Sequence, residues 1–317
     1  CSSDLVDFML EISEYVNLNG VKQYILATGN ENGPLMLFLH GGPGVSQSGF
    51  IRKYQSKLEE DFLVVNWDQR GAGKSNTKIF SKDELKINNI VNDAISLIEI
   101  LRDRFKKNRI YLVGHSFGSL IGIILSQKIP QYIKAYISIG QVVNINEGDK
   151  FIYKILLKKV NNENYQKGIK ILKNIGKPPY KTQDSINKLN KLIQKYKGDV
   201  FKFSKISLML KSISFKYYNL FDWFKFLGGI IISNRYMYSE MSCINLFNAN
   251  NKFEIPIYFC CGDNDYHTPS KIVEEYYNFI NAPKKQIYKF KASAHMPNIE
   301  EETCFYNMCK AIYRENE

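Results

Sequence analysis

Short apolar runs alternate with longer amphipathic stretches along the first 140 residues of the chain, and again after residue 252. The runs are rich in β-branched and aromatic residues, and most of them are apolar at successive positions. This pattern is typical of strands that are buried on both faces. The strands predicted in this way are 21–29, 34–40, 62–68, 109–115, 133–140, 255–262 and 285–290.

Between these runs, apolar residues recur at helical spacing. In 87–105 the pattern includes Ile90, Ala94, Leu97 and Leu101, which lie three or four residues apart on one helix face. Further helices are predicted at 117–129, at 270–280 and within 301–314. An order of strand, helix, strand, helix predicts the α/β class, with a mostly parallel sheet and crossover helices.

The alternation lapses for about a hundred residues in the middle of the chain. This part is rich in Lys, Asn and Tyr, with an amphipathic stretch at 150–160 and a break at the Gly-Lys-Pro-Pro-Tyr sequence of 176–180. We therefore predict a core formed by 1–140 and 251–317, and a mainly helical, Lys-rich insertion at 141–250.

The net charge of +12 is concentrated in one segment. Residues 150–216 hold 17 lysines, no arginine and three acids, a net charge of +14, whereas the remaining residues balance to −2. A nucleic-acid-binding protein usually adds arginine forks, a known motif or stacking aromatics to such a patch, and none is recognisable here. We predict no nucleic-acid partner and interpret the lysines as a solvated helical surface or, as the alternative, a surface for an anionic partner.

The six cysteines show neither metal-ligand spacing nor a regular disulfide framework. They are interpreted as small buried apolar side chains in a reducing compartment, which predicts a cytoplasmic protein. Cys1 leaves an alternative open, because a chain that begins Cys-Ser-Ser-Asp could be a lipid-anchored extracytoplasmic lipoprotein or a longer sequence cut at that point. No run approaches 18 apolar residues, so we predict no membrane span.

The stretch 114–118 reads Gly-His-Ser-Phe-Gly, between a predicted strand and a predicted helix. In this context G-x-S-x-G is the pattern of a nucleophile elbow, a sharp turn that needs small neighbours and exposes the serine hydroxyl at the helix N-terminus. Ser116 is therefore the candidate nucleophile.

A serine nucleophile needs a base, and the chain offers only His40, His115, His267 and His295. His295 lies between the last predicted strand and the last helix, where the chain order Ser, Asp, His places the base. His115 is expected to point away from the serine, His40 to orient a loop and His267 to line the site.

The carboxylate that orients the base is expected on the loop after strand 255–262, which holds Asp263 and Asp265. Spacing from the strand end favours Asp265, which would fix the tautomer of His295 and stabilise its imidazolium form. Asp263 is expected to shape the turn.

The oxyanion of an acyl-transfer intermediate needs hydrogen-bond donors, and the Gly-rich run 40–44 follows a predicted strand. Its glycines let the backbone approach a substrate, so the amides of Gly42 and of Phe117 are the candidate pair. The run 70–75, Arg-Gly-Ala-Gly-Lys-Ser, resembles the end of a phosphate-binding loop but has Asp68 where that motif needs glycine, so nucleotide binding is rejected.

Five segments taken together resemble the α/β-hydrolase family that includes the proline iminopeptidases. They are HGGPG (40–44), NWDQRGAGKS (66–75), GHSFGS (114–119), GDNDYHTP (262–269) and SAHMPNIEE (293–301), and the resemblance spans 21–140 and 252–314. It implies an α/β-hydrolase fold with Ser116, Asp265 and His295 as a catalytic triad and the insertion as a cap over the site. Members of the group release N-terminal residues, often proline, from peptides, and relatives hydrolyse other amides and esters.

The chain departs from the group in its elbow and in its cap. The elbow of iminopeptidases is commonly Gly-Gly-Ser-Trp-Gly, and here His115 and Phe117 replace the second glycine and the tryptophan. An exopeptidase needs an anion for the substrate amine, because a buried ammonium group without a partner is costly. Glu240 is the first candidate for this role and Asp222 the second.

These observations predict a serine aminopeptidase of the proline iminopeptidase type that acts on short peptides through an acyl-enzyme. The alternative within enzymes is a carboxylesterase or amidase for a small uncharged molecule, and the remote alternative is a non-catalytic sensor on the same fold. No metal or cofactor motif is recognisable, and the predicted chemistry needs neither.

Overall fold

The computed structural model of the chain describes residues 9–180, 182–204 and 216–317. The strands in these ranges form one eight-stranded sheet in the order β1-β2-β4-β3-β5-β6-β7-β8. From β4 to β8 all neighbours are parallel, whereas β2 is antiparallel to both β1 and β4. The strands are β1 (Met9–Leu18), β2 (Val21–Asn30), β3 (Leu35–Leu39), β4 (Leu63–Trp67), β5 (Ile110–His115), β6 (Ile133–Ile139), β7 (Ile257–Gly262) and β8 (Lys285–Phe290).

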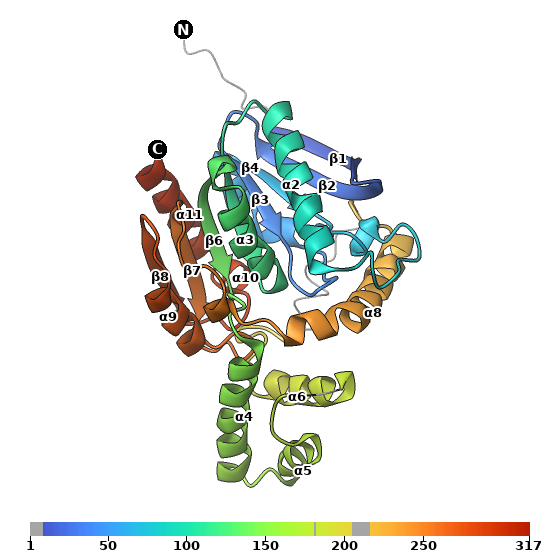
Figure 1. The fold of residues 1–317 in the computed structure, drawn as a ribbon, viewed down its shortest axis with the longest axis vertical. Coiled ribbons are helices and arrows are strands. Elements are labelled where there is room, and N and C mark those ends of the chain that lie inside the picture. The colour runs from blue at the N-terminus through green and yellow to red at the C-terminus, as the bar shows by residue number, and fades with distance from the viewer. Residues whose placement is uncertain (1–8, 181, 205–215) are drawn as a thin grey trace.

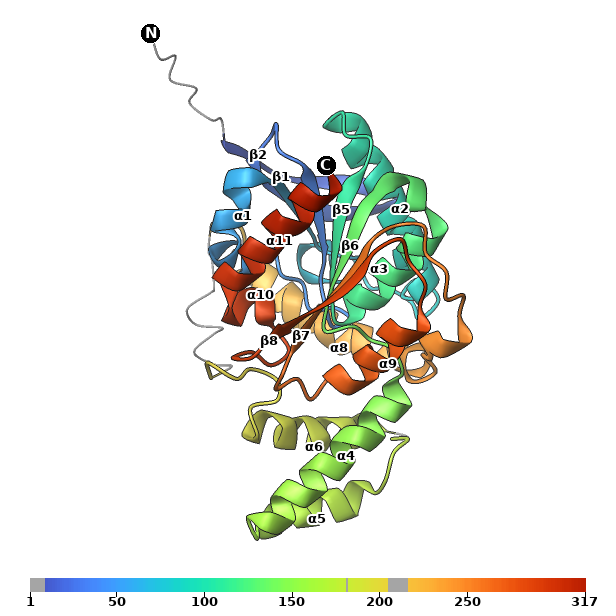
Figure 2. The same cartoon turned by 90° about the vertical axis from the view of Figure 1, so that its left-hand side faces the viewer.

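Helices cover both faces of the sheet (Figures 1 and 2). Side chains of α2, α3 and α9 pack on one face, and those of α1 and α11 pack on the other. The helices are α1 (Ser56–Asp61), α2 (Ile87–Arg104), α3 (Phe117–Lys128), α4 (Ile145–Asn162), α5 (Gln166–Ile175), α6 (Gln183–Lys195), α8 (Leu220–Ser242), α9 (Ser270–Phe279), α10 (Pro297–Glu300) and α11 (Glu302–Asn316), with short 3₁₀ turns at Ile51–Tyr54, Gly73–Ser75, Pro130–Tyr132 and Leu246–Asn248.

The central strands β3, β4 and β5 are buried at every position because each of their faces meets a helix layer. In β3, Leu35, Leu37 and Leu39 contact the core on the side of α2 and α3, and Met36 and Phe38 contact the core on the side of α11. The fold class predicted from the sequence is confirmed, and every predicted strand forms within two residues of its expected bounds. β1 is an addition that we did not predict.

The helices of the insertion separate into two groups. α4, α5 and α6 pack on one another around their own apolar cluster and project from the sheet layer (Figures 1 and 2). α8 instead lies against the loops of the core, where Gly229 contacts the backbone of Gly71 and of Gly44. The division of the chain into a core and a cap stays a prediction.

The cysteines only partly follow the expectation. Cys260, Cys261 and Cys309 are buried, but Cys243 and Cys304 are exposed, and all five are free thiols. The interpretation of the cysteines as buried side chains was therefore wrong for these two, because both lie on the solvent side of their segments. Cys1 lies outside the described residues, and no described helix is long and apolar enough to cross a bilayer.

Candidate active site

The turn between β5 and α3 holds Ser116 in a strained backbone conformation. Its φ and ψ are 53° and −118°, a combination that residues with a side chain rarely adopt. The amide of Ser116 donates to the carbonyl of Ile139 at 2.9 Å, which fixes the turn to the end of β6. Gly118 is needed for the close approach of α3 to β3, because a Cβ there would lie 2.1 Å from the carbonyl oxygen of Leu39. The sequence thus folds into the sharp turn that the G-x-S-x-G spacing predicts.

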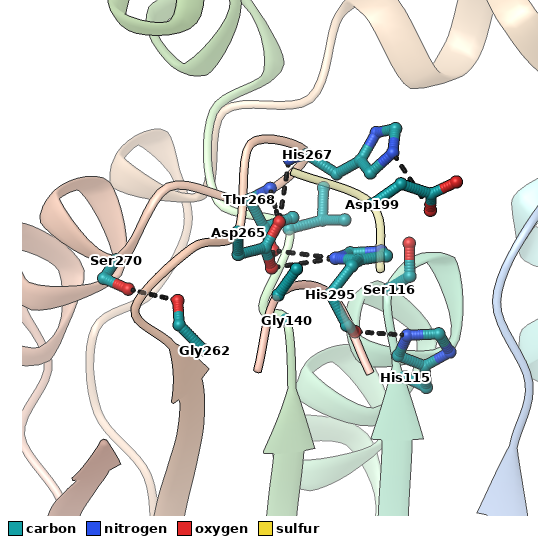
Figure 3. A network of polar contacts seen from close by, with 12 residues as sticks. His115, Ser116, Gly140, Asp199, Gly262, Asp265, His267, Thr268, Ser270 and His295 are labelled. Carbon is teal, nitrogen blue, oxygen red and sulfur yellow. Dashed lines mark hydrogen bonds and ion pairs between the residues drawn. The ribbon is translucent and has the colours of Figure 1, made fainter. Parts of the chain in front are cut away.

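Asp265 and His295 meet beside this turn, although they follow different strands. Asp265 lies on the loop after β7 and His295 on the loop after β8, and His295 Nδ1 lies 2.8 Å from Asp265 Oδ2. A carboxylate only accepts hydrogen bonds, so Nδ1 carries the proton and Nε2 carries the lone pair. Figure 3 shows the imidazole of His295 between the Asp265 carboxylate and the Ser116 side chain.

The Asp265 carboxylate is held by four donors. Its Oδ1 accepts from the amides of His267 at 2.7 Å and Thr268 at 2.9 Å, and its Oδ2 accepts from the Thr268 hydroxyl at 2.7 Å and from His295. Burial acts to raise the pKa of Asp265, but the adjacent His295 and these donors outweigh burial, so the pKa lies below its ordinary value. Asp265 is therefore an anion at neutral pH, suited to stabilise an imidazolium. Asp263 is exposed, and its amide bonds to the Phe290 carbonyl.

His115 supports the loop that carries His295. Its Nε2 donates to the backbone carbonyl of His295 at 2.9 Å, and its Nδ1 accepts from the side-chain amide of Gln47 at 3.0 Å. Burial, followed by the neighbouring His295, lowers the pKa of His115 to about 3. His115 is thus a neutral, buried side chain that fixes the position of the His295 backbone.

His40 anchors the Gly-rich run. Its Nδ1 donates to the carbonyl of Gly41 at 2.8 Å, and its Nε2 accepts from the amide of Gln69 at 3.1 Å. Burial lowers its pKa to about 4, so the ring is neutral and orients the loop. A Cβ on Gly41 would lie 3.1 Å from Ser116 Cβ, which puts the Gly-rich run directly beside the serine.

The two candidate oxyanion donors come from the two segments that flank Ser116. Gly42 has a φ of 122°, a value that glycine adopts readily and residues with a side chain rarely adopt, so the backbone turns at this point. Phe117 is the first residue of α3, and the first amides of a helix have no acceptor within it. The arrangement can place two backbone N–H groups on one side of a substrate carbonyl.

His267 and Asp199 form a second imidazole–carboxylate pair in the site. His267 Nε2 lies 3.4 Å from Asp199 Oδ1, and the ring centroids of His267 and His295 are 4.9 Å apart. Asp199 is only 5% exposed, and its carbonyl accepts from the His295 amide at 3.2 Å. In Figure 3 the Asp199 carboxylate is drawn between the His267 ring and the Ser116 side chain. Sequence reasoning missed Asp199, since one acid in a Lys-rich segment without a motif carries no signal.

The two acids predicted to bind a substrate amine lie at helix termini. Glu240 accepts from the amide of Ile87 at 2.8 Å, which caps α2. Asp222 completes a capping box with Asn219 at the start of α8. These contacts give both carboxylates a role in helix capping, and their assignment to the substrate amine stays a prediction.

The described residues contain no group of three or more His, Cys, Asp or Glu side chains arranged to hold a metal ion. Asp265 and His295 are arranged as an orienting carboxylate and a base would be, and a triad with Ser116 stays a prediction.

Comparisons with known proteins agree with this fold. Residues 34–168 match the family described as the alpha/beta hydrolase fold. The probable aminopeptidase YbaC of Bacillus subtilis is 31% identical over 302 residues, which cover 94% of this chain and 95% of that protein. The chain therefore belongs to the α/β-hydrolase family.

More limited similarities point to one group within the family. A putative proline iminopeptidase of Mycoplasma genitalium is 33% identical over 125 residues, or 39% of this chain and 38% of that protein. Among solved structures, a proline iminopeptidase-related protein from Thermus thermophilus has a TM-score of 0.67 at 17% identity, with 96% of this chain and 97% of that chain covered. The proline iminopeptidase of Mycobacterium smegmatis has a TM-score of 0.65 at 14% identity, over 96% and 99% of the two chains. At these identities the structural matches show the fold alone.

Proposed function

We propose that the protein is a serine aminopeptidase of the proline iminopeptidase type, which releases N-terminal residues from short peptides. The observation that carries the proposal is the bond of 2.8 Å between His295 and Asp265 beside a serine held on a strained turn. The aminopeptidase and proline iminopeptidase names of the relatives support peptides as substrates.

In the proposed reaction Ser116 Oγ attacks the carbonyl carbon of the N-terminal residue, and His295 Nε2 takes the hydroxyl proton. Asp265 stabilises the imidazolium that forms. The amides of Gly42 and Phe117 donate to the oxyanion of the tetrahedral intermediate. His295 then protonates the leaving amine, and a water activated by the same imidazole hydrolyses the acyl-enzyme.

The substrate's free amine requires an anion close to Ser116, and we assign this role to Asp199. Asp199 is 5% exposed, pairs with His267 at 3.4 Å, and accepts the His295 amide through its backbone carbonyl. In Figure 3 its carboxylate lies on the Ser116 side of His267, which supports this role for Asp199 ahead of Glu240 and Asp222.

The test is a panel of fluorogenic aminoacyl amides, including proline, with their N-acetylated forms and a short-chain ester. Free-amine substrates are expected to react, acetylation is expected to abolish turnover, and Ser116→Ala is expected to lower kcat by a factor of at least about 10⁴. Equal turnover of free and acetylated amides, or turnover of the ester alone, would refute the aminopeptidase and favour the esterase or amidase alternative.

The role of Asp199 has its own readout. Asp199→Asn is expected to lower kcat/KM for free-amine substrates by about 100-fold, the size of a lost charged hydrogen bond, and to leave ester hydrolysis unchanged. An equal loss on amides and ester would show that Asp199 supports the fold of the site and does not bind the amine.

A further inference from the structure

The outer face of α8 exposes more apolar surface than any other part of the described chain. Together with Ile79 of a neighbouring loop, five of its side chains are the most exposed large apolar residues in the described ranges. Their exposed fractions are 69% for Leu220, 66% for Phe221, 71% for Phe224, 56% for Leu227, 68% for Ile231 and 93% for Ile79. The loop of Ile79 is tied to the helix, because the side-chain amide of Asn76 donates to the Lys225 carbonyl at 3.0 Å.

These side chains form one continuous stripe along the helix. Leu220, Phe224, Leu227 and Ile231 are spaced by four, three and four residues, which places them on a single face. The opposite face includes Phe226, Gly229, Ser233 and Met237, which are buried. Five large side chains that are each more than half exposed present on the order of 500 Å² of apolar surface, which monomeric proteins rarely leave without a partner.

The charged side chains of α8 that take no part in capping are positive. α8 carries four charged residues, and its two acids, Asp222 and Glu240, are engaged in helix capping. The remaining two are Lys225 and Arg235, and the ammonium of Lys225 lies 5.0 Å from the centre of the Phe221 ring on the stripe itself. A second copy of the protein would bring like charges together, whereas an anionic surface is complementary to them.

We propose that the outer face of α8 is a docking surface for an anionic lipid membrane. The helix would lie in the plane of the bilayer surface, with its five apolar side chains at the boundary of headgroups and acyl chains and with Lys225 at the anionic headgroups. This interaction is peripheral, and it is independent of the proposed peptidase activity.

Docking in this way would hold the active site close to the lipid. The inner face of α8 contacts the Gly-rich run, because a Cβ on Gly44 would lie 2.8 Å from Ser233 Cβ and the Asn234 side-chain amide donates to the Pro43 carbonyl at 3.4 Å. A helix with its side chains is about 10 Å thick, so one helix would separate the candidate oxyanion site from the membrane surface.

The experiment is cosedimentation of the full chain with vesicles of phosphatidylcholine alone and of phosphatidylcholine with phosphatidylglycerol. The protein is expected to bind the anionic vesicles at least about 10-fold more tightly, and added salt is expected to weaken that binding. Phe224→Ser is expected to weaken it by about 10-fold through lost apolar burial, and Lys225→Glu by about 10-fold through charge reversal. Ile100→Ser, at an exposed apolar residue of α2, is the matched control and is expected to bind as the parent does.

Each variant is first checked for unchanged thermal unfolding and for unchanged hydrolysis of the preferred aminoacyl amide. No binding to anionic vesicles, equal binding to both vesicle types, or equal loss in Ile100→Ser would overturn the proposal. Sedimentation velocity provides the remaining outcome. A dimer that Phe224→Ser dissociates, in a protein that binds no vesicles, would show that a second copy covers the stripe.

Discussion

The strain at Ser116 predicts an unusual order of stability for two variants that both lack the hydroxyl. Replacement of alanine by glycine normally destabilises a protein by roughly 0.5–1 kcal/mol, because glycine loses more backbone entropy on folding. At φ 53° and ψ −118°, however, a residue with a Cβ incurs strain of about 1–3 kcal/mol that glycine does not. Ser116→Gly is therefore expected to be more stable than Ser116→Ala by about 1 kcal/mol, the reverse of the usual order.

The assay is urea unfolding of both variants, with the free energy of unfolding taken from the midpoint and slope. Ala311→Gly, at an exposed position in the final helix α11, is the control and is expected to lose about 1 kcal/mol against the parent. If Ser116→Gly is less stable than Ser116→Ala by the same amount as this control, the turn is unstrained and the reasoning fails. If Ser116→Gly is more stable than Ser116→Ala, as expected, then the strained turn that presents the serine hydroxyl lowers the stability of the parent protein.

Three further outcomes follow from the site. Asp265→Asn is expected to lower kcat by about 10⁴-fold while KM changes little, because His295 loses the anion that fixes its tautomer. A decrease in kcat of less than about 10-fold in steady-state kinetics would argue against the triad. Gly262→Ala is expected to prevent folding at 37 °C, since its Cβ would lie 1.9 Å from the Ala294 carbonyl oxygen, and a cooperative thermal transition near that of the parent would contradict this. Burial lowers the pKa of His115 to about 3. The contribution of the neutral His115 ring to the free energy of unfolding is therefore complete above pH 6.5 and falls by about 1.4 kcal/mol per pH unit below that pH. The loss of unfolding free energy caused by His115→Gln, measured by urea unfolding, should therefore be about 2 kcal/mol smaller at pH 5 than at pH 7.5. An equal loss at both pH values would show that the ring titrates normally.

Much of the fold could be predicted because the parallel strands are apolar on both faces and the helices between them are amphipathic. β1 was missed although its signal was present. Residues 9–18 alternate between exposed and partly buried positions, and Asn19-Gly20 has positive φ at both residues, as a tight hairpin requires. The pattern was weaker than that of the core strands because β1 lies at the sheet edge, where one face meets solvent.

The candidate triad residues could be predicted since each follows a strand at a fixed place in the chain order. The charged residues of the insertion could not, because their roles depend on which elements they meet after folding. Glu240 follows Ile87, the first residue of α2, by 153 residues in the sequence. Only the structure shows that Glu240 caps this helix. Asp199 reaches the site because residues 198 and 199 accept hydrogen bonds from Tyr266 and His295, a docking that no local spacing encodes.

The position of β8 at the edge of the sheet has a consequence for how activity is lost. Ser116 follows β5, which is buried at every residue and has a strand on either side, whereas His295 follows β8, whose residues are mostly half-exposed and which pairs with β7 alone. Edge elements open at lower free energy than central ones. Detachment of β8 would move His295, the proposed base, away from Ser116 while the turn that holds Ser116 stays intact. Activity should therefore be lost at urea concentrations where most of the molecule is still folded. The time for which the enzyme stays active should be set by the detachment of β8.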